Sequence, residues 1–332
     1  MIAVLTSAFM LKALLAALLT GASAPAVGTF LVQRRLSLLG DGIGHITVTG
    51  VAVGILTGTS PTWTAIAAAV IGAILIELIR ASGRTSGDVA LALLFYGGIA
   101  AGLVLVSRAG NGMYSMQQYL FGSITSLSGQ DVLVSGLLAV AVLVLTFTLL
   151  PQLYAVASDE SYARTQGLPV WLYSTAISVM AAVSVSVAMR TVGLLLVSAL
   201  MIIPVATTQQ FARSFRTTMV TAMGAGALAG FLGVASTAII DAPPGATIVL
   251  VSLFGFALTA PVGILIQRRR RALVPFPDDG GNHHLNAHPP QENHQHLHGP
   301  GCGHIAVEHG DHVDYIHDGQ RHAAHGGHYD QH

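Results

Sequence analysis

The sequence predicts an all-α polytopic membrane protein that ends in a polar, histidine-rich tail. Of its 332 residues, 52% are hydrophobic and only 9% are charged, with a mean hydropathy of +0.66. Soluble domains carry about 25% charged residues, so a soluble fold of this length is not expected. Residues 272–332 hold fourteen of the fifteen histidines and the only cysteine. We therefore expect a transmembrane domain over residues 1–271 and a disordered tail over residues 272–332.

Apolar segments long enough to cross a bilayer as helices recur along the first domain. One crossing needs about 20 mostly apolar residues, and a helix satisfies its own backbone hydrogen bonds in lipid. We predict about nine spans, with eight as the alternative, because the second segment is short and glycine-rich. The nine segments are residues 9–31, 43–58, 62–80, 89–107, 131–150, 170–189, 191–209, 217–237 and 246–266.

The distribution of positive charge predicts the orientation in the plasma membrane. With nine spans, the connections on one side of the membrane carry eleven arginines. The other side has only Lys12, Arg108 and Arg190. Cytoplasmic connections are enriched in Lys and Arg, so the N-terminus is expected outside and the tail in the cytoplasm. The eleven arginines of the predicted cytoplasmic side are Arg34, Arg35, Arg80, Arg84, Arg164, Arg213, Arg216 and the run 268–271.

Two polar residues at the second span are the first candidates for chemistry. Asp41 and His45 are four residues apart, which places both on one face of a helix. A carboxylate and an imidazole suit Zn²⁺, Mn²⁺ or Fe²⁺, and a two-fold dimer meeting here would supply four ligands. The alternative is structural: Asp41 caps the helix and His45 is an interior histidine with its hydrogen bonds satisfied.

A polar segment after the fifth predicted span is the second candidate. It begins at Ser158 and ends at Gly167 and Pro169, so we expect a short helix along the membrane surface. It is either a solvated connector or a docking element for a cytoplasmic subunit. The only lysine, Lys12, is not preceded by a glycine-rich loop, so the chain lacks the phosphate-binding motif of ATPases. If transport is ATP-driven, a separate chain hydrolyses the ATP, and this chain is not itself an enzyme.

Several motifs together resemble the metal-type ABC permeases, the membrane subunits of zinc, manganese and iron uptake systems, and zinc permeases are the most similar. The resemblance covers about residues 8–268. The matching segments are Arg34–Asp41 with His45, Gly50–Ala52, Leu120–Gly122, Ala163-Arg164, Gly167–Pro169, Val192–Leu200 with Pro204, and Pro244–Leu250. The chain departs from the family pattern at Gly42–Gly44, at Val48–Gly50 and at Ser123.

The resemblance implies a type II permease of the vitamin-B12-importer kind that works as a homodimer. A cytoplasmic ATP-binding subunit and an external metal-binding protein would be its partners, and no nucleic acid is expected. Asp41 and His45 would lie on the path of the metal, which is substrate rather than a tightly bound cofactor. The expected docking residues for the ATPase are Asp159, Glu160, Ala163, Arg164, Gly167, Leu168 and Pro169.

The tail offers a further set of metal ligands. Neutral imidazole and thiolate bind Zn²⁺ in preference to Mn²⁺, so the tail favours zinc as the imported ion. The alternatives are a manganese or iron permease, and a secondary metal transporter or membrane metal sensor that works without an ATPase. The candidate tail ligands are His283, His284, His288, His294, His296, His298, Cys302, His304, His309 and His312.

Overall fold

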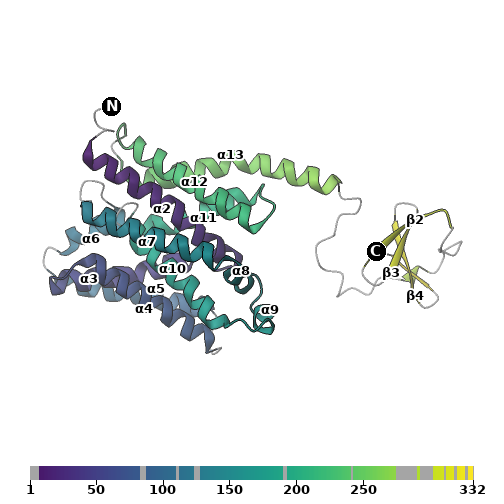
Figure 1. The fold of residues 1–332 in the computed structure, drawn as a ribbon, viewed down its shortest axis with the longest axis horizontal. Helices are drawn as coiled ribbons and strands as arrows, with labels where there is room; N and C mark the ends of the chain where they lie inside the picture. The colour runs from purple at the N-terminus through teal and green to yellow at the C-terminus, as the bar shows by residue number, and fades with distance from the viewer. Residues whose placement is uncertain are drawn as a thin grey trace. The chain divides into compact units, whose positions relative to one another are not determined.

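The computed structural model consists of two compact units, Met1–Arg269 and Arg270–His332. The first is a bundle of α-helices and the second contains a β-sheet (Figure 1). The structure describes residues 7–82, 87–109, 112–122, 128–189, 193–240, 242–273, 290–291, 302–309, 312–317, 320–325 and 328–331.

The helices of the bundle follow the apolar segments of the sequence. Short connections join antiparallel neighbours, and the short helices α6 (Gly112–Phe121) and α9 (Glu160–Thr165) lie at opposite ends of the bundle (Figure 1). In chain order the helices are α2 (Ala8–Gln33), α3 (Leu39–Thr57), α4 (Pro61–Ala81), α5 (Gly87–Ser107), α6 (Gly112–Phe121), α7 (Gly129–Thr148), α8 (Leu150–Ser158), α9 (Glu160–Thr165), α10 (Val170–Met189), α11 (Leu194–Gln209), α12 (Phe215–Ser236) and α13 (Pro244–Leu273).

Eight helices in the described part of the chain are long and apolar enough to cross a membrane: α2, α3, α4, α5, α7, α10, α12 and α13. This agrees with the smaller of the two predicted counts, but the short segment is not the one the sequence indicated. The glycine-rich second segment forms a regular helix of 19 residues, whereas α11 has only 16 and contains Pro204. Glycine at positions 50 and 54 allows close packing on α4, so the glycines reflect contact rather than a break.

Burial separates central helices from peripheral ones. Within their apolar windows, 72% of α2, 61% of α3 and 67% of α10 are buried, against 22% of α5 and of α7 and 17% of α13. Because lipid is as apolar as leucine, exposed apolar side chains on the outer helices are compatible with a bilayer. The polar residues of α3 therefore lie on one of the most enclosed elements of the fold.

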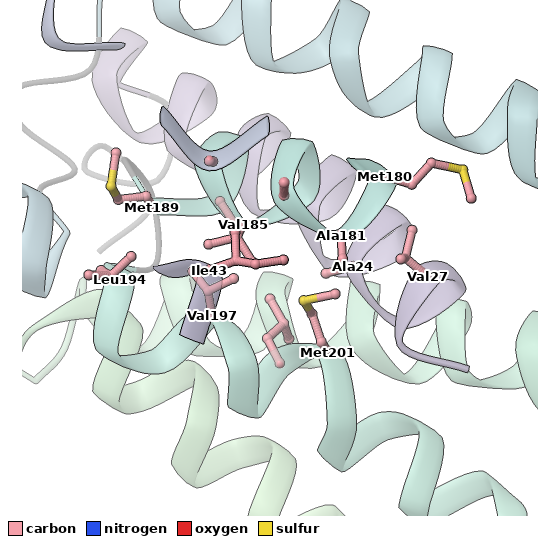
Figure 2. Close-up of a cluster of buried hydrophobic side chains, with 14 of the residues drawn as sticks. Ala24, Val27, Ile43, Met180, Ala181, Val185, Met189, Leu194, Val197 and Met201 are labelled. Carbon is pink, nitrogen blue, oxygen red and sulfur yellow. The ribbon is translucent and has the colours of Figure 1, made fainter. Parts of the chain in front are cut away.

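A cluster of buried apolar side chains joins the central helices α2, α3, α10 and α11 (Figure 2). Ile43 of α3 is fully buried there beside residues of α10 and α11. This cluster fixes α3 against α11, and so fixes the position of Asp41 and His45 two residues to either side of Ile43. Its other labelled members are Ala24, Val27, Met180, Ala181, Val185, Met189, Leu194, Val197 and Met201.

The C-terminal unit contains an antiparallel sheet in the order β1-β5-β4-β3-β2, where composition predicts disorder. Its strands are β1 (Pro290–Gln291), β2 (Ile305–His309), β3 (His312–His317), β4 (Gln320–His325) and β5 (His328–Gln331). The pairs between consecutive strands, Gly310-Asp311, Asp318-Gly319 and Gly326-Gly327, are residue types that favour two-residue hairpin connections. Composition misses this regular spacing because it counts residues without regard to their order.

Candidate functional site

Asp41 and His45 lie one turn apart on α3, as their spacing predicts. The carboxylate Oδ1 of Asp41 accepts a hydrogen bond from Ser198 Oγ of α11 at 3.2 Å. The first helical residue is Leu39 and the N-cap is Leu38, so Asp41 is not the capping residue. His45 Nδ1 lies 2.8 Å from the backbone oxygen of Asp41. Since a carbonyl only accepts, Nδ1 donates, and a neutral His45 then has its lone pair on Nε2.

A cavity of about 320 Å³ opens beside the Asp41 side chain. Aromatic and aliphatic residues of α5 form most of its wall, and the His45 ring packs on Phe95 with centroids 4.1 Å apart. A carboxylate with mainly apolar neighbours attracts a cation more strongly than a carboxylate in water does. The cavity is lined by Leu38, Asp41, Leu91, Ala92, Phe95 and Tyr96.

Within the described residues, no group of three or more His, Cys, Asp or Glu side chains could hold a metal ion. On α3, Asp41 and His45 provide two side chains of metal-ligating type on one helical face, and the Ser198 hydroxyl lies beside the carboxylate. A bound cation would need water, a backbone carbonyl or a second copy to complete its coordination. Such an open shell suits transient passage better than permanent retention of an ion.

The predicted surface helix is present as α9 and carries the expected docking residues. Asp159 caps it by accepting from the backbone N–H groups of Ser161 and Tyr162. Gly167 ends it with φ +77°, a conformation that favours glycine, and Pro169 follows. Ala163 is buried and Leu168 is partly buried, so these two anchor the segment to its neighbours. Arg164, with its exposed neighbours Tyr162, Thr165 and Gln166, forms the outward surface.

The remaining docking candidate, Glu160, belongs to a charged cluster that the sequence did not reveal. Its Oε1 accepts hydrogen bonds from Nη2 of Arg34 at 2.5 Å and from Nη2 of Arg80 at 2.6 Å. Both arginines also lie near buried Glu77, at 3.9 Å and 3.7 Å. Burial and the nearby charge of Arg80 lower the pKa of Arg34, while Glu77 and Glu160 act in the opposite direction. Two arginines and two acids thus balance in formal charge.

The carboxylate of Glu77 accepts hydrogen bonds from two serine hydroxyl groups of α10. Ser174 Oγ donates at 3.0 Å and Ser178 Oγ at 2.7 Å. The Glu77 side chain is only 4% exposed, and its nearest positive charge on the same helix is Arg80, three residues later. The sequence offered one signal for this cluster: Arg34, Arg80 and Glu160 lie at or beside connections predicted on one side of the membrane.

The structure describes only part of the predicted tail site. Cys302 and His304 are partly buried, and the backbones of His309 and His312 lie in β2 and β3. Six candidates, His283, His284, His288, His294, His296 and His298, lie outside the described residues. The backbone register adds two histidines that the sequence did not single out, His325 and His328, which pair with each other between β4 and β5.

Comparison with known proteins decides the family. Residues 6–262 match the ABC 3 transport family. The chain belongs to this family. The membership predicted from the motifs is thereby confirmed, together with the helical permease fold. As a multi-pass ABC 3 transport protein, the chain is a membrane component of a transporter rather than an enzyme.

Relatives in the ABC 3 transport family cover most of the chain. A manganese import system permease protein of Streptococcus pneumoniae is 30% identical over 267 residues, which is 80% of this chain and 95% of the relative. A manganese transport system membrane protein of Halalkalibacterium halodurans is 28% identical, covering 76% and 87%. The solved structure of PsaBC from S. pneumoniae in complex with Fab has a TM-score of 0.72 at 28% identity, covering 81% of this chain and 100% of that chain.

Proposed function

We propose that the chain is the permease of an ATP-driven divalent metal importer and that Asp41 and His45 contact the ion during passage. The observation that carries the proposal is the pair itself, one turn apart on α3, with the Asp41 side chain lining a cavity whose other walls are mainly apolar. Charged groups at membrane depth are costly and are retained where they act on a substrate. Family membership supports the same assignment.

The cargo we propose is Mn²⁺, in place of the zinc that the tail favours. Relatives that cover most of the chain are named as manganese transporters. The chemistry of the site agrees, because a carboxylate and a hydroxyl are hard oxygen groups and only one imidazole is present. The histidines of the tail belong to a separate unit, so their preference for zinc need not describe the cargo.

Uptake of radioactive Mn²⁺ and Zn²⁺ by cells that express the chain with its partners tests the proposal. Asp41→Asn and His45→Ala should each lower Mn²⁺ uptake by about tenfold or more, while the complex still assembles. Asp131→Asn is the matched control, because Asp131 belongs to the capping box of α7 and lies outside the site. Wild-type uptake by both site variants would eliminate the assigned site, and saturable uptake of zinc alone would eliminate the proposed cargo.

For the partners, we propose a cytoplasmic ATP-binding subunit on α9, an external metal-binding protein at the opposite end, and a second copy of the chain. The positions of the arginines support this orientation. Arg34 and Arg80, at the ends of α2 and α4, donate hydrogen bonds to Glu160 of α9. Arg216, in the first turn of α12, lines a cavity with Tyr154 of α8 and so belongs to the same end. The positive-inside rule places that end in the cytoplasm.

Co-purification tests the docking surface. Arg164→Glu reverses an exposed charge on α9 and should release the ATP-binding subunit without changing the fold of the permease. Arg108→Glu makes the same change in an exposed arginine just after α5 and should leave the subunit bound. Equal recovery of the subunit with both variants would contradict docking on α9.

A second proposal concerns the tail, which we infer binds an ion of the Zn²⁺ type. His309 pairs with His312 and His325 with His328. Asp314 lies opposite Ala323, so His312, two residues back along β3, lies opposite His325. Four histidines therefore form one row across four strands. The proposal rests on these positions in the backbone register together with the affinity of imidazole for Zn²⁺.

Zinc titration of the full-length chain in detergent tests the tail. Replacing these four histidines by alanine should remove a tight zinc equivalent, measured by calorimetry. Replacing His283, His284, His288 and His294 instead removes as many imidazoles outside the row and should have a smaller effect. Equal losses from both sets would show that histidine content, rather than the sheet register, determines zinc binding.

A further inference from the structure

The charged cluster at the inner end of the bundle contains two acids that face the same two arginines. Glu160 of α9 accepts the short hydrogen bonds from Arg34 and Arg80, and its side chain is 42% exposed. Glu77 of α4 is buried and lies 3.7–3.9 Å from the same guanidinium groups, beyond ordinary hydrogen-bond length. The arginines therefore bond directly to Glu160 of α9, and they reach Glu77 only through Ser174, whose hydroxyl oxygen accepts from both of them and donates to Glu77.

The cluster has unused hydrogen-bonding capacity. Nη1 of Arg34 is buried and has no hydrogen-bond partner among the described residues, although Glu77 Oε1 lies 3.9 Å away. A buried guanidinium N–H without an acceptor is unfavourable, and a shift of about 1 Å would bring it within bonding distance of Glu77. The two serine hydroxyl groups of α10 hold the Glu77 carboxylate in place for that exchange. Two discrete arrangements of the same charges are thus available.

The position of the cluster connects the surface helix to the site. An apolar contact of Ala163 with Val156 and Val170 holds α9 to α8 and α10, whereas Glu160 joins it to the ends of α2 and α4. Arg34 is the C-cap of α2, and α3 begins five residues later at Leu39. Asp41 is in the first turn of α3, so a displacement of Arg34 acts on the connection that leads directly into the site.

We propose that Glu160 and Glu77 compete for Arg34 and Arg80, and that this exchange transmits movement of α9 to α2, α4 and the Asp41 end of α3. Glu160 is then a positioning residue that couples the ATP-binding subunit to the metal path. The inference rests on the proposed function, because it assumes that an ATPase moves α9. When α9 is drawn away from the bundle, the arginines transfer to Glu77 and the ends of α2 and α4 shift with them.

The test uses the complex of this chain with its ATP-binding subunit in proteoliposomes, with Mn²⁺ as the transported ion. Glu160→Gln should keep the subunit bound and hydrolysing ATP but lower Mn²⁺ uptake on the order of tenfold, since bonds to charged groups are lost. Arg80→Gln should do the same, and the double variant should lose no more than either single one. Arg80→Lys retains the charge and should recover part of the uptake. Asp131→Asn and Arg108→Gln, which lie outside the cluster, should combine additively with Glu160→Gln.

Each outcome bears on the proposal separately from the proposed function. Absence of Mn²⁺ uptake by the unmodified complex would overturn the proposed function, whereas normal uptake by Glu160→Gln would overturn only the coupling. Release of the ATP-binding subunit by Glu160→Gln would also overturn it, because Glu160 would then be a docking contact. Hydrogen exchange of the purified chain gives a second measurement: faster exchange in α9 of Glu160→Gln supports the link, and unchanged exchange contradicts it.

Discussion

Two adjacent glycines of α5 allow a controlled perturbation of the candidate site. A Cβ at Gly98 would lie 2.8 Å from the backbone carbonyl carbon of His45 and 2.9 Å from its oxygen, whereas ordinary contacts begin near 3.4 Å. Backbone atoms cannot rotate away, so Gly98→Ala must move α5 from α3 by about half an ångström. Overpacking of this kind costs about 1–3 kcal/mol. Gly97→Ala meets no atom within 4 Å and gains only the helix preference of alanine, about 0.5–1 kcal/mol.

Thermal unfolding in detergent, followed by size-exclusion fluorescence, compares the two variants directly. Gly98→Ala should unfold at a lower temperature than Gly97→Ala, because both gain the same helix preference and only one has the backbone clash. Phe95, one turn earlier on α5, packs on His45, so Mn²⁺ uptake should fall in Gly98→Ala and not in Gly97→Ala. Equal unfolding temperatures and equal uptake would refute the close α3–α5 contact at His45.

Three further predictions follow from the same structure. In Gly226→Ala the new Cβ would lie 2.2 Å from the backbone oxygen of Gly21, so thermal stability should fall by about 1–3 kcal/mol, whereas Gly224→Ala on the same helix meets nothing and should not lower it. Glu77→Gln removes a buried charge beside Arg34 and should destabilise the chain by about 3 kcal/mol in the same assay, more than Asp131→Asn does; equal shifts would contradict the buried ion pairs. Deletion of residues 272–332 should leave Mn²⁺ uptake largely intact, and its abolition would instead favour the membrane metal sensor.

The candidate site was accessible from the sequence only in outline. Spacing alone places Asp41 and His45 on one helical face, and motif resemblance connects them with metal passage. The Ser198 hydroxyl and the Phe95 ring come from helices more than 150 and about 50 residues away, and no local pattern specifies such neighbours. The sequence also placed Arg34, Arg80 and Glu160 on one side of the membrane, but it could not show that they touch.

The sequence by itself determined the membrane class, the approximate position of each span, the absence of an ATP-binding motif and the family. These follow from the length and apolar character of each segment and from local motifs, because a bilayer imposes its thickness on every helix separately. Tertiary structure decided which apolar segment is short, which glycines permit helix contact, and which acid each arginine bonds. In the tail, strand pairing rather than composition placed His309 opposite His312 and His325 opposite His328. Such features depend on distances between residues far apart in the chain, which the order of residues does not contain locally.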